Sequence, residues 1–370
     1  MISLANTGPY CIDGRTFSKE DLLAHSHMMH HDCKNPGWFR KVFQFIESFL
    51  QSDSGAILQR SSGTTGDAKE FELSREAMQA SALLTLSFFK LKQGERVLLC
   101  LPVDYIAGKM MVVRALVGGL DLVLTEPSSR PLNLVEGEFR FMPLVPLQVI
   151  ESFGAGDDLS RTSILLIGGG ELPTSLKAKI EALSIPEVYE SFGMSETYTH
   201  FALRRINGPG QESSFRLLKG AVISLDTRGC LVVDLPGVTR GKVVTNDLVE
   251  IDEGGKSFTW LGRYDNVINT GGIKVIPEIL EARIGSLLGA TVLILPVEDE
   301  KLGQKILLMV EWKMTEAHTS FNKISDQWRS ILGRALSSHE LPKKIIPVPE
   351  LPRNASHKPD RKAARALLSE

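Results

Sequence analysis

The nine residues SSGTTGDAK at positions 61–69 have the composition of a turn that binds phosphate. They follow the apolar run AILQR and precede a helix-like segment, where backbone N–H groups can face anionic oxygens. Glycine lets the backbone approach a ligand closely, hydroxyls donate hydrogen bonds and a lysine adds positive charge. The residues concerned are Ser61, Ser62, Gly63, Thr64, Thr65, Gly66 and Lys69. The Gly-Lys-Ser/Thr ending of a Walker A motif is missing, so the loop alone is more typical of a solvated turn.

Five further segments are rich in glycine or in acidic, basic and hydroxyl side chains. They are LLIGGG (165–170), YESFGMSETYTH (189–200), VTNDLVEID (244–252), LGRYDNVINTGGIK (261–274) and LPRNASHKPDR (351–361). Each segment taken singly is more typical of a surface turn or a solvated tail than of a site. Their chemistry becomes specific only if the fold brings them together.

The elements that must position these segments follow from the hydrophobic pattern. Short apolar runs alternate with helix-like stretches up to about residue 193, which predicts a mostly parallel, doubly wound α/β sheet. Residues 1–53 predict helices, with Ser18 as an N-cap. Shorter strands with turn residues predict a β-rich subdomain over 215–262. Mixed α/β character then resumes, so we expect a large domain over 1–262 and a small α+β domain over 263–370, hinged near 263–266.

Composition excludes several classes of protein. The chain of 370 residues has a formal net charge of −2, from 42 Lys and Arg against 44 Asp and Glu. This balance predicts small-molecule partners and no nucleic acid.

The four cysteines are widely spaced, which predicts reduced, buried thiols. No apolar stretch approaches the ~20 residues of a membrane span, and no targeting segment begins the chain, so we expect no membrane insertion and a cytoplasmic location. The oligomeric state stays open.

The segments resemble, in order, the motifs of the adenylate-forming superfamily, which includes acyl-CoA synthetases and adenylation domains. SSGTTGDAK is similar to its nucleotide loop and YESFGMSETYTH to its second core motif. VTNDLVEID is similar to its ribose-binding strand, LGRYDNVINTGGIKVIPEILEARI (261–284) to its hinge motif and LPRNASHKPDR to its catalytic-lysine motif. The resemblance extends from residue 61 to residue 361 and implies an enzyme that uses ATP, Mg²⁺ and CoA.

The resemblance also implies a role for individual residues. Thr64 and Glu196 would orient Mg²⁺ on the ATP phosphates, one of them through water. Asp247 would accept both ribose hydroxyls, and Arg263 would contact the ribose or phosphates. The remaining positions expected around ATP or AMP are Gly169, Gly170, Ser191, Phe192, Gly193, Met194 and Thr197.

Two steps of chemistry are implied. The oxygen of a carboxylic acid attacks the α-phosphate of ATP and releases pyrophosphate, while Lys358 stabilises charge at the reacting centre. The small domain then turns about Asp265, Lys358 leaves, and CoA replaces AMP. Gly271 and Gly272 would line the narrow channel for the pantetheine arm of CoA.

The identity of the acid is less constrained by the motifs. Only 60 residues precede the loop at 61–69. In this short N-terminal part the chain resembles the compact 2-succinylbenzoate–CoA ligases of menaquinone biosynthesis. Such an acid has a second carboxylate, for which the pocket should offer a cation. Lys109, Arg114, Arg204 and Arg205 are the candidates, and the sequence does not choose among them. The alternatives are another aryl- or acyl-CoA ligase, an enzyme that loads a carrier protein, or, less expected, a nucleotide-binding relative without catalysis.

Replacing the catalytic lysine should separate the two half-reactions. In Lys358→Ala we expect adenylation, measured as pyrophosphate release, to fall by orders of magnitude because the charge at the α-phosphate is no longer offset. Transfer of the acyl group to CoA from supplied acyl-adenylate should largely persist. Equal loss in both half-reactions would contradict the assigned role.

Overall fold

The computed structural model describes most of the chain. The described ranges are 8–51, 57–60, 70–170, 172, 174–312, 321–353 and 359–368. The nucleotide loop at 61–69 and the segment 354–358 with Lys358 therefore lie outside the described residues.

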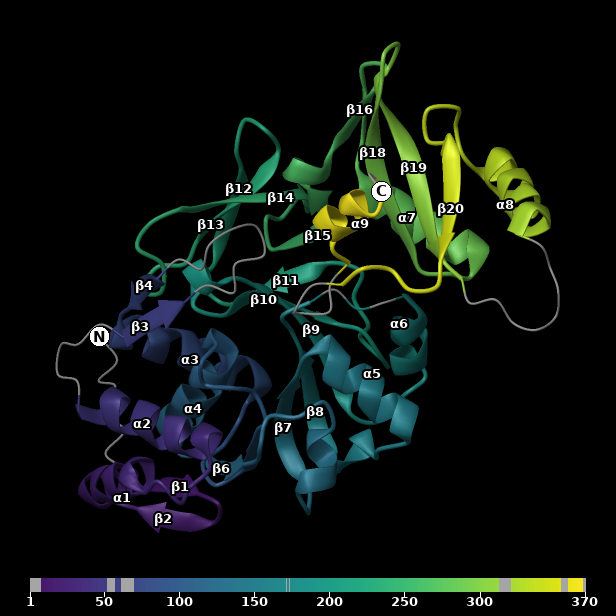
Figure 1. The fold of residues 1–370 in the computed structure, drawn as a ribbon. Helices are drawn as coiled ribbons and strands as arrows, with labels where there is room; N and C mark the ends of the chain where they lie inside the picture. Colours follow the sequence, from purple (N-terminus) through teal and green to yellow (C-terminus); the bar gives the residue numbers. More distant parts are fainter. Residues whose placement is uncertain are drawn as a thin grey trace.

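One large sheet organises the first 263 residues (Figure 1). Within the described ranges it has 13 strands in the order β12-β13-β14-β15-β11-β10-β9-β8-β7-β5-β6-β1-β2. The strands from β9 to β1 are parallel: β9 (Glu187–Gly193), β8 (Thr162–Ile167), β7 (Phe139–Leu144), β5 (Arg96–Leu99), β6 (Asp121–Leu124) and β1 (Tyr10–Ile12). β2 (Arg15–Phe17) pairs with β1 in the antiparallel sense.

The other half of this sheet is antiparallel. It consists of β10 (His200–Arg205), β11 (Phe215–Leu217), β15 (Ser257–Arg263), β14 (Val243–Ile251), β13 (Cys230–Asp234) and β12 (Val222–Leu225). The β-rich texture predicted for 215–262 is thus confirmed, and these strands extend the same sheet. The site segments come from both halves, because the second motif lies where β9 turns back into β10.

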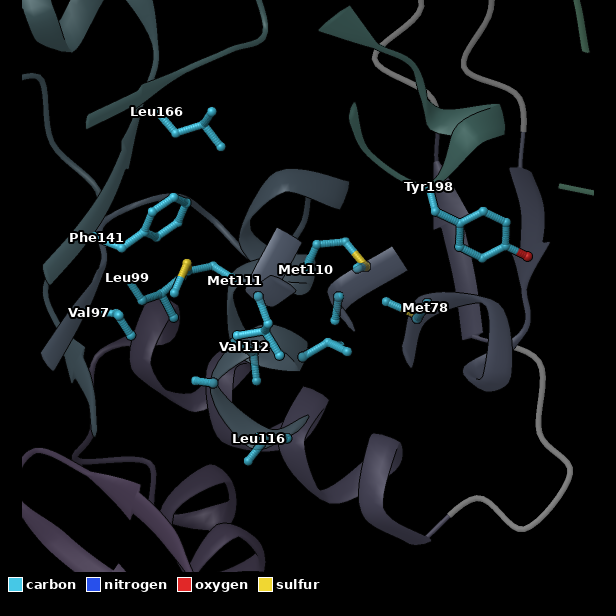
Figure 2. Close-up of a cluster of buried hydrophobic side chains, with 14 of the residues drawn as sticks. Met78, Val97, Leu99, Met110, Met111, Val112, Leu116, Phe141, Leu166 and Tyr198 are labelled. Atoms are coloured by element: carbon cyan, nitrogen blue, oxygen red, sulfur yellow. The ribbon is translucent and has the colours of Figure 1, made fainter. Parts of the chain in front are cut away.

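Helices cover both faces of the parallel strands, as predicted for a doubly wound sheet. They are α1 (Lys19–His31), α2 (Gly37–Gln51), α3 (Arg75–Phe89), α4 (Ile106–Gly118), α5 (Pro146–Ala155) and α6 (Thr174–Glu181). Neighbouring strand residues alternate between two cores: Leu99 and Leu166 join the core of α2, α3 and α4, while Leu98 and Leu165 join that of α5 and α6. Figure 2 shows the first core, where Met111 of α4 belongs to the same cluster as the strand residues.

The C-terminal residues form a separate, smaller sheet. Its strands are β16 (Ile268–Thr270), β17 (Ile273–Val275), β18 (Val292–Asp299), β19 (Gly303–Glu311) and β20 (Lys344–Val348). Its helices are α7 (Pro277–Leu288), α8 (Phe321–Ala335) and α9 (Arg361–Ala366). α7 and α8 share one core with the sheet, and α9 packs on a second core with Leu293 and Leu295.

Some details differ from the sequence expectations. Ser18 caps α1 as predicted, its hydroxyl accepting from the backbone N–H of Asp21. The helices expected within residues 1–53 are present as α1 and α2, but β1 and β2 precede α1 and add two strands to the sheet edge. All four cysteines are free thiols, but Cys33 is exposed, so the expectation of buried thiols is wrong there. In the described part of the chain, no helix is both long and apolar enough to cross a bilayer.

Candidate active site

The glycine turn after β8 lies against the end of β9. Gly168 follows β8, and a Cβ on this residue would lie 2.5 Å from the hydroxyl oxygen of Ser191. That hydroxyl donates to the carbonyl oxygen of Ile167 over 3.1 Å. Gly169 has φ of 78°, which favours glycine. The structure thus brings together two of the predicted segments, with Gly169 and Gly170 at the carboxyl ends of parallel strands, where ligands of such sheets bind.

The second motif forms a tight turn between β9 and β10. Met194 precedes the 3₁₀ helix η3 (Ser195–Thr197), and its N–H donates to the buried Thr197 hydroxyl over 3.1 Å. Gly193 leaves no room for a side chain, because a Cβ there would lie 2.1 Å from the carbonyl oxygen of Thr199. Thr197 therefore closes the turn from inside, while Glu196 is exposed on it.

Phe192 has a packing role that its motif position did not reveal. Its ring lies 5.2 Å from the ring of Phe215 and 5.1 Å from that of Phe258, both in edge-on geometry. Such aromatic pairs stabilise by about 1 kcal/mol beyond their buried area. The side chain expected beside AMP is thus also part of the core that joins β9 to β11 and β15.

Three successive residues after the turn hydrogen-bond to one face of α3. The Tyr198 hydroxyl accepts from the backbone N–H of Ser74 over 3.0 Å. The Thr199 hydroxyl lies 3.1 Å from that of Ser81, and Nε2 of His200 lies 3.1 Å from the hydroxyl of Thr85. We call residues 198–200 with Ser74, Ser81 and Thr85 the α3 clamp. Tyr198 adopts the uncommon φ of 63°, which the clamp holds in place.

The α3 clamp ties the second motif to the arms of the nucleotide loop. β3 (Ile57–Arg60) and β4 (Glu70–Leu73) pair as an antiparallel hairpin, in which Arg60 is opposite Glu70. Ser74 follows β4 directly and is the N-cap of α3. Ser61, Ser62, Gly63, Thr64, Thr65, Gly66 and Lys69 connect the two strands and lie outside the described residues. The exposed carboxylate of Glu196 thus lies on a turn that is anchored beside this hairpin.

Glu196 has the chemistry of a ligand for a hard cation. Mg²⁺ prefers oxygen donors and keeps several waters, so one exposed carboxylate suits it. No hydrogen bond or ion pair to Glu196 is present among the described residues, which leaves both oxygens open to a ligand. Its expected partner Thr64 is outside the described residues.

Asp247 and Arg263 face each other across β14 and β15. They are paired in register, and the Arg263 guanidinium lies 3.5 Å from Oδ1 of Asp247. The Trp260 indole N–H donates to the same oxygen over 3.0 Å. The Asp247 side chain is 10% exposed, and both described side-chain contacts go to Oδ1. The geometry leaves Oδ2 to accept hydrogen bonds from a ligand, as a ribose-binding carboxylate requires.

The predicted hinge is linked to the catalytic-lysine segment by a buried ionic network. Asp265 accepts two hydrogen bonds of 3.1 Å from Asn246. The next residue, Asn266, donates to Glu278 of α7 over 2.5 Å. Arg361 reaches the same Glu278 at 3.3 Å and binds both oxygens of Glu281 at 2.7 and 2.8 Å. Bidentate pairs of this kind fix orientation as well as charge.

Lys358 lies outside the described residues, but the ends of its segment are placed. Arg353 and Pro359 form a β-bridge, so the chain leaves and returns at neighbouring positions. Asp360 caps α9 by accepting from the N–H groups of Lys362 and Ala363, each over 2.9 Å. Arg361 follows at once, so the network of Glu278 and Glu281 begins three residues after the lysine.

Gly271 and Gly272 form the turn of the hairpin between β16 and β17. Their φ values of 61° and 84° are those of a two-residue hairpin turn that excludes most other residues. The N–H of Gly271 donates to the carbonyl oxygen of Leu302 over 2.8 Å. The turn alone accounts for these glycines, and their expected place along a CoA channel stays a prediction.

The four candidate cations for a second carboxylate occupy different surroundings. Arg204 pairs with Glu190, and Arg205 pairs with Glu187 at 3.2 Å. Lys109 is half-buried on α4. Arg114 is only 3% exposed, and among the described residues no hydrogen bond or ion pair to its guanidinium is found.

Arg114 lies beside the α3 clamp. Burial lowers the pKa of Arg114 to about 9, so the guanidinium keeps its charge at neutral pH. Burial together with this neighbouring cation holds the pKa of His200 well below its usual value, so His200 is neutral. An isolated buried charge is costly. The arrangement is therefore suited to an anion that arrives with the substrate.

Comparison with known proteins agrees with this geometry. The sequence model of the family described as AMP-binding enzyme matches residues 6–235, more than half of the chain. The chain therefore belongs to the AMP-binding enzyme family.

Particular relatives sharpen the comparison. The chain is 34% identical to an acyl-CoA synthetase (AMP-forming)/AMP-acid ligase II-like protein from Dyadobacter fermentans, whose crystal structure matches with a TM-score of 0.60 over 90% of this chain and 95% of that one. It is 26% identical to a 2-succinylbenzoate–CoA ligase of a Geobacillus strain, over 87% of this chain and 71% of the relative. The o-succinylbenzoate CoA synthetase of Bacillus subtilis, solved with an acyl-adenylate intermediate, shares the fold at 16% identity and a TM-score of 0.73, over 98% and 96% of the chains.

Replacing Gly193 should damage the site without a change in charge. In Gly193→Ala the new Cβ meets backbone atoms at 2.1 and 2.5 Å, so the second-motif turn must shift. We expect a loss of about 2 kcal/mol of unfolding free energy, measured by urea denaturation, and a large drop in acid-dependent AMP formation. Gly154→Ala is the matched control: nothing lies within 4 Å, and alanine favours α5. Equal stability and activity of both variants would show that the close approach is unimportant.

Proposed function

We propose that this chain converts a carboxylic acid and ATP into an acyl-adenylate and then transfers the acyl group to CoA, with 2-succinylbenzoate as the acid. Membership of the AMP-binding enzyme family supports the adenylation step. The names of the curated relatives and the buried cation Arg114, which has no partner among the described residues, support a substrate with two carboxylates.

In the first step, an oxygen of the acid attacks the α-phosphate, and pyrophosphate leaves. We assign the leaving phosphates to the loop 61–69 and the α-phosphate to Lys358. Glu196 and Thr64 would hold Mg²⁺, which when bound offsets the negative charge of the phosphates. Asp247 would accept the ribose hydroxyls through its open oxygen, with Arg263 beside it. When these residues close around the reacting centre, they would exclude water. Water would otherwise hydrolyse the mixed anhydride.

In the second step, residues 263–370 would turn about Asp265 so that CoA can reach the acyl-adenylate. The buried network of Arg361 with Glu278 and Glu281 supports this proposal, because it ties the lysine segment to α7 and the small domain can move as one body. The only described links from this network to the hinge region are the Asn266 hydrogen bond and the close packing of Gly262 on Glu278. Few polar contacts would have to break for the domain to turn.

Arg114 would bind the carboxylate of the acid that does not react. A charged hydrogen bond in such surroundings contributes about 1.5–3 kcal/mol, or roughly ten- to a hundredfold in affinity. Without the anion, the guanidinium has no described counter-charge. The preference for a dicarboxylate would thus come from relief of an unpaired buried charge.

A panel of acids tests the proposed reaction directly. We expect 2-succinylbenzoate to give AMP and pyrophosphate at the highest rate, and CoA to raise turnover by accepting the acyl group. Benzoate, a fatty acid of similar size and a carrier protein in place of CoA are the comparison arms. Turnover with another acid alone would overturn the substrate, and turnover with the carrier but not with CoA would overturn the acceptor.

Replacing Arg114 should lower activity without lowering stability. In Arg114→Met we expect kcat/KM for 2-succinylbenzoate to fall ten- to a hundredfold, while benzoate is used as poorly as before. The melting temperature should stay the same or rise, because the variant removes a buried charge that has no counter-charge in the described part of the chain. Arg205→Met, which breaks the ion pair with Glu187, is the control and should spare the preference between the two acids. A strong loss of stability in Arg114→Met, with both acids affected equally, would assign Arg114 a structural role instead.

A further inference from the structure

Three histidines cluster on the last turns of α1, apart from the site described above. His27, His30 and His31 each offer a ring nitrogen, and these nitrogens lie within 4.8 Å of one another. Spacings of three and four residues place all three side chains on one side of the helix. The ring centroids of His30 and His31 are 3.8 Å apart, and those of His27 and His31 are 4.4 Å apart.

A buried carboxylate of α2 stands behind two of these rings. Oε1 of Glu47 lies 3.0 Å from Nδ1 of His27, and Oε2 lies 2.9 Å from Nδ1 of His30. The His27 contact has hydrogen-bond geometry, whereas Nδ1 of His30 is buried and poorly aligned with its neighbour. Gln51 donates to Oε1 over 3.0 Å and fixes the carboxylate further. Glu47 is 9% exposed, so its charge needs partners of this kind.

The position of Glu47 decides which ring atoms are available. A histidine whose Nδ1–H faces a carboxylate presents an unprotonated Nε2 on the other side of the ring, and this is the tautomer that binds metal ions. A carboxylate behind metal-bound histidines is a recurrent arrangement, because it orients the ring and raises its basicity. Glu47 makes this contact with His27 by a hydrogen bond, and its other oxygen lies 2.9 Å from Nδ1 of His30 without hydrogen-bond geometry.

We propose that His27, His30 and His31 bind one divalent transition metal ion of the Zn²⁺ type through three imidazole nitrogens, oriented from behind by Glu47. Imidazole suits Zn²⁺, and three such ligands leave a fourth position for water. Mg²⁺ and Ca²⁺ prefer oxygen ligands, so the site would not compete with Glu196 for Mg²⁺.

The metal would bind to α1, whose histidine rings contact Glu47 of α2, rather than act on the acid. α1 and α2 lie at the β1 and β2 end of the large sheet, far along it from β9 and β10, as Figure 1 shows. α1 ends at His31, so a metal there would hold the last turn of this helix against Glu47 of α2. The expected consequence is a more stable N-terminal layer.

The test uses the full chain without an affinity tag, stripped of metal by a chelator and dialysed. Zn²⁺ is titrated by calorimetry in the absence of ATP and Mg²⁺, and the melting temperature is measured in parallel. We expect one Zn²⁺ per chain and a Zn²⁺-dependent rise in melting temperature. His27→Gln and His31→Gln, at exposed positions, should each weaken affinity at least tenfold and reduce that rise.

Two further variants separate the site from general histidine binding. Glu47→Gln should keep the stoichiometry and weaken affinity about 10- to 100-fold, because the orienting carboxylate is lost. His339→Gln, in the C-terminal part of the chain, should bind Zn²⁺ as the parent does. The proposal is overturned if the parent takes up no Zn²⁺, or if His27→Gln and His31→Gln bind it as tightly as His339→Gln. Circular dichroism of each variant checks that it is folded.

Discussion

The hydrogen bonds between residues 198–200 and α3 are the constraint on which the site depends. The α3 clamp joins segments that are more than a hundred residues apart in the chain. Each hydrogen bond contributes about 1 kcal/mol net, so the energy is modest, but an unsatisfied buried group would cost more. Through Tyr198 the clamp fixes the turn with Glu196 beside the nucleotide-loop hairpin. Through His200 it meets the buried cation Arg114, so the proposed nucleotide and acid positions share one support.

A second support lies in the C-terminal part. Arg361 binds Glu281 in bidentate fashion and also reaches Glu278, which in turn accepts from Asn266 at the predicted hinge. The large sheet thus presents the proposed nucleotide-binding residues through backbone turns and the α3 clamp, whereas the ends of the segment with Lys358 are anchored to a small sheet with its own core. This division suits a reaction whose two steps need different residues beside the same intermediate.

Sequence reasoning predicted the parallel sheet, the antiparallel strands after residue 215 and the C-terminal helices, because these follow from local hydrophobic periods. It also placed Asp247 and Arg263 in one site, and the structure pairs them across two strands. It did not find the roles of Tyr198 and Arg361, since hydrogen bonds between distant segments leave no periodic signal. The choice of Arg114 among four cations needed burial and neighbours, which a sequence does not contain. The predicted helix around Arg114 gave no hint that its guanidinium would have no hydrogen-bond or ion-pair partner among the described residues.

The most direct measurement is acid-dependent exchange of labelled pyrophosphate into ATP by Tyr198→Phe, because this exchange reports adenylation alone. The variant keeps the ring and removes only the hydroxyl that accepts from Ser74. Tyr189→Phe is the control, since its hydroxyl contacts only Glu187 in the described structure. If the α3 clamp supports the site, exchange with 2-succinylbenzoate should fall at least tenfold in folded Tyr198→Phe and stay near the parent value in Tyr189→Phe. Equal exchange rates in both variants would contradict the account.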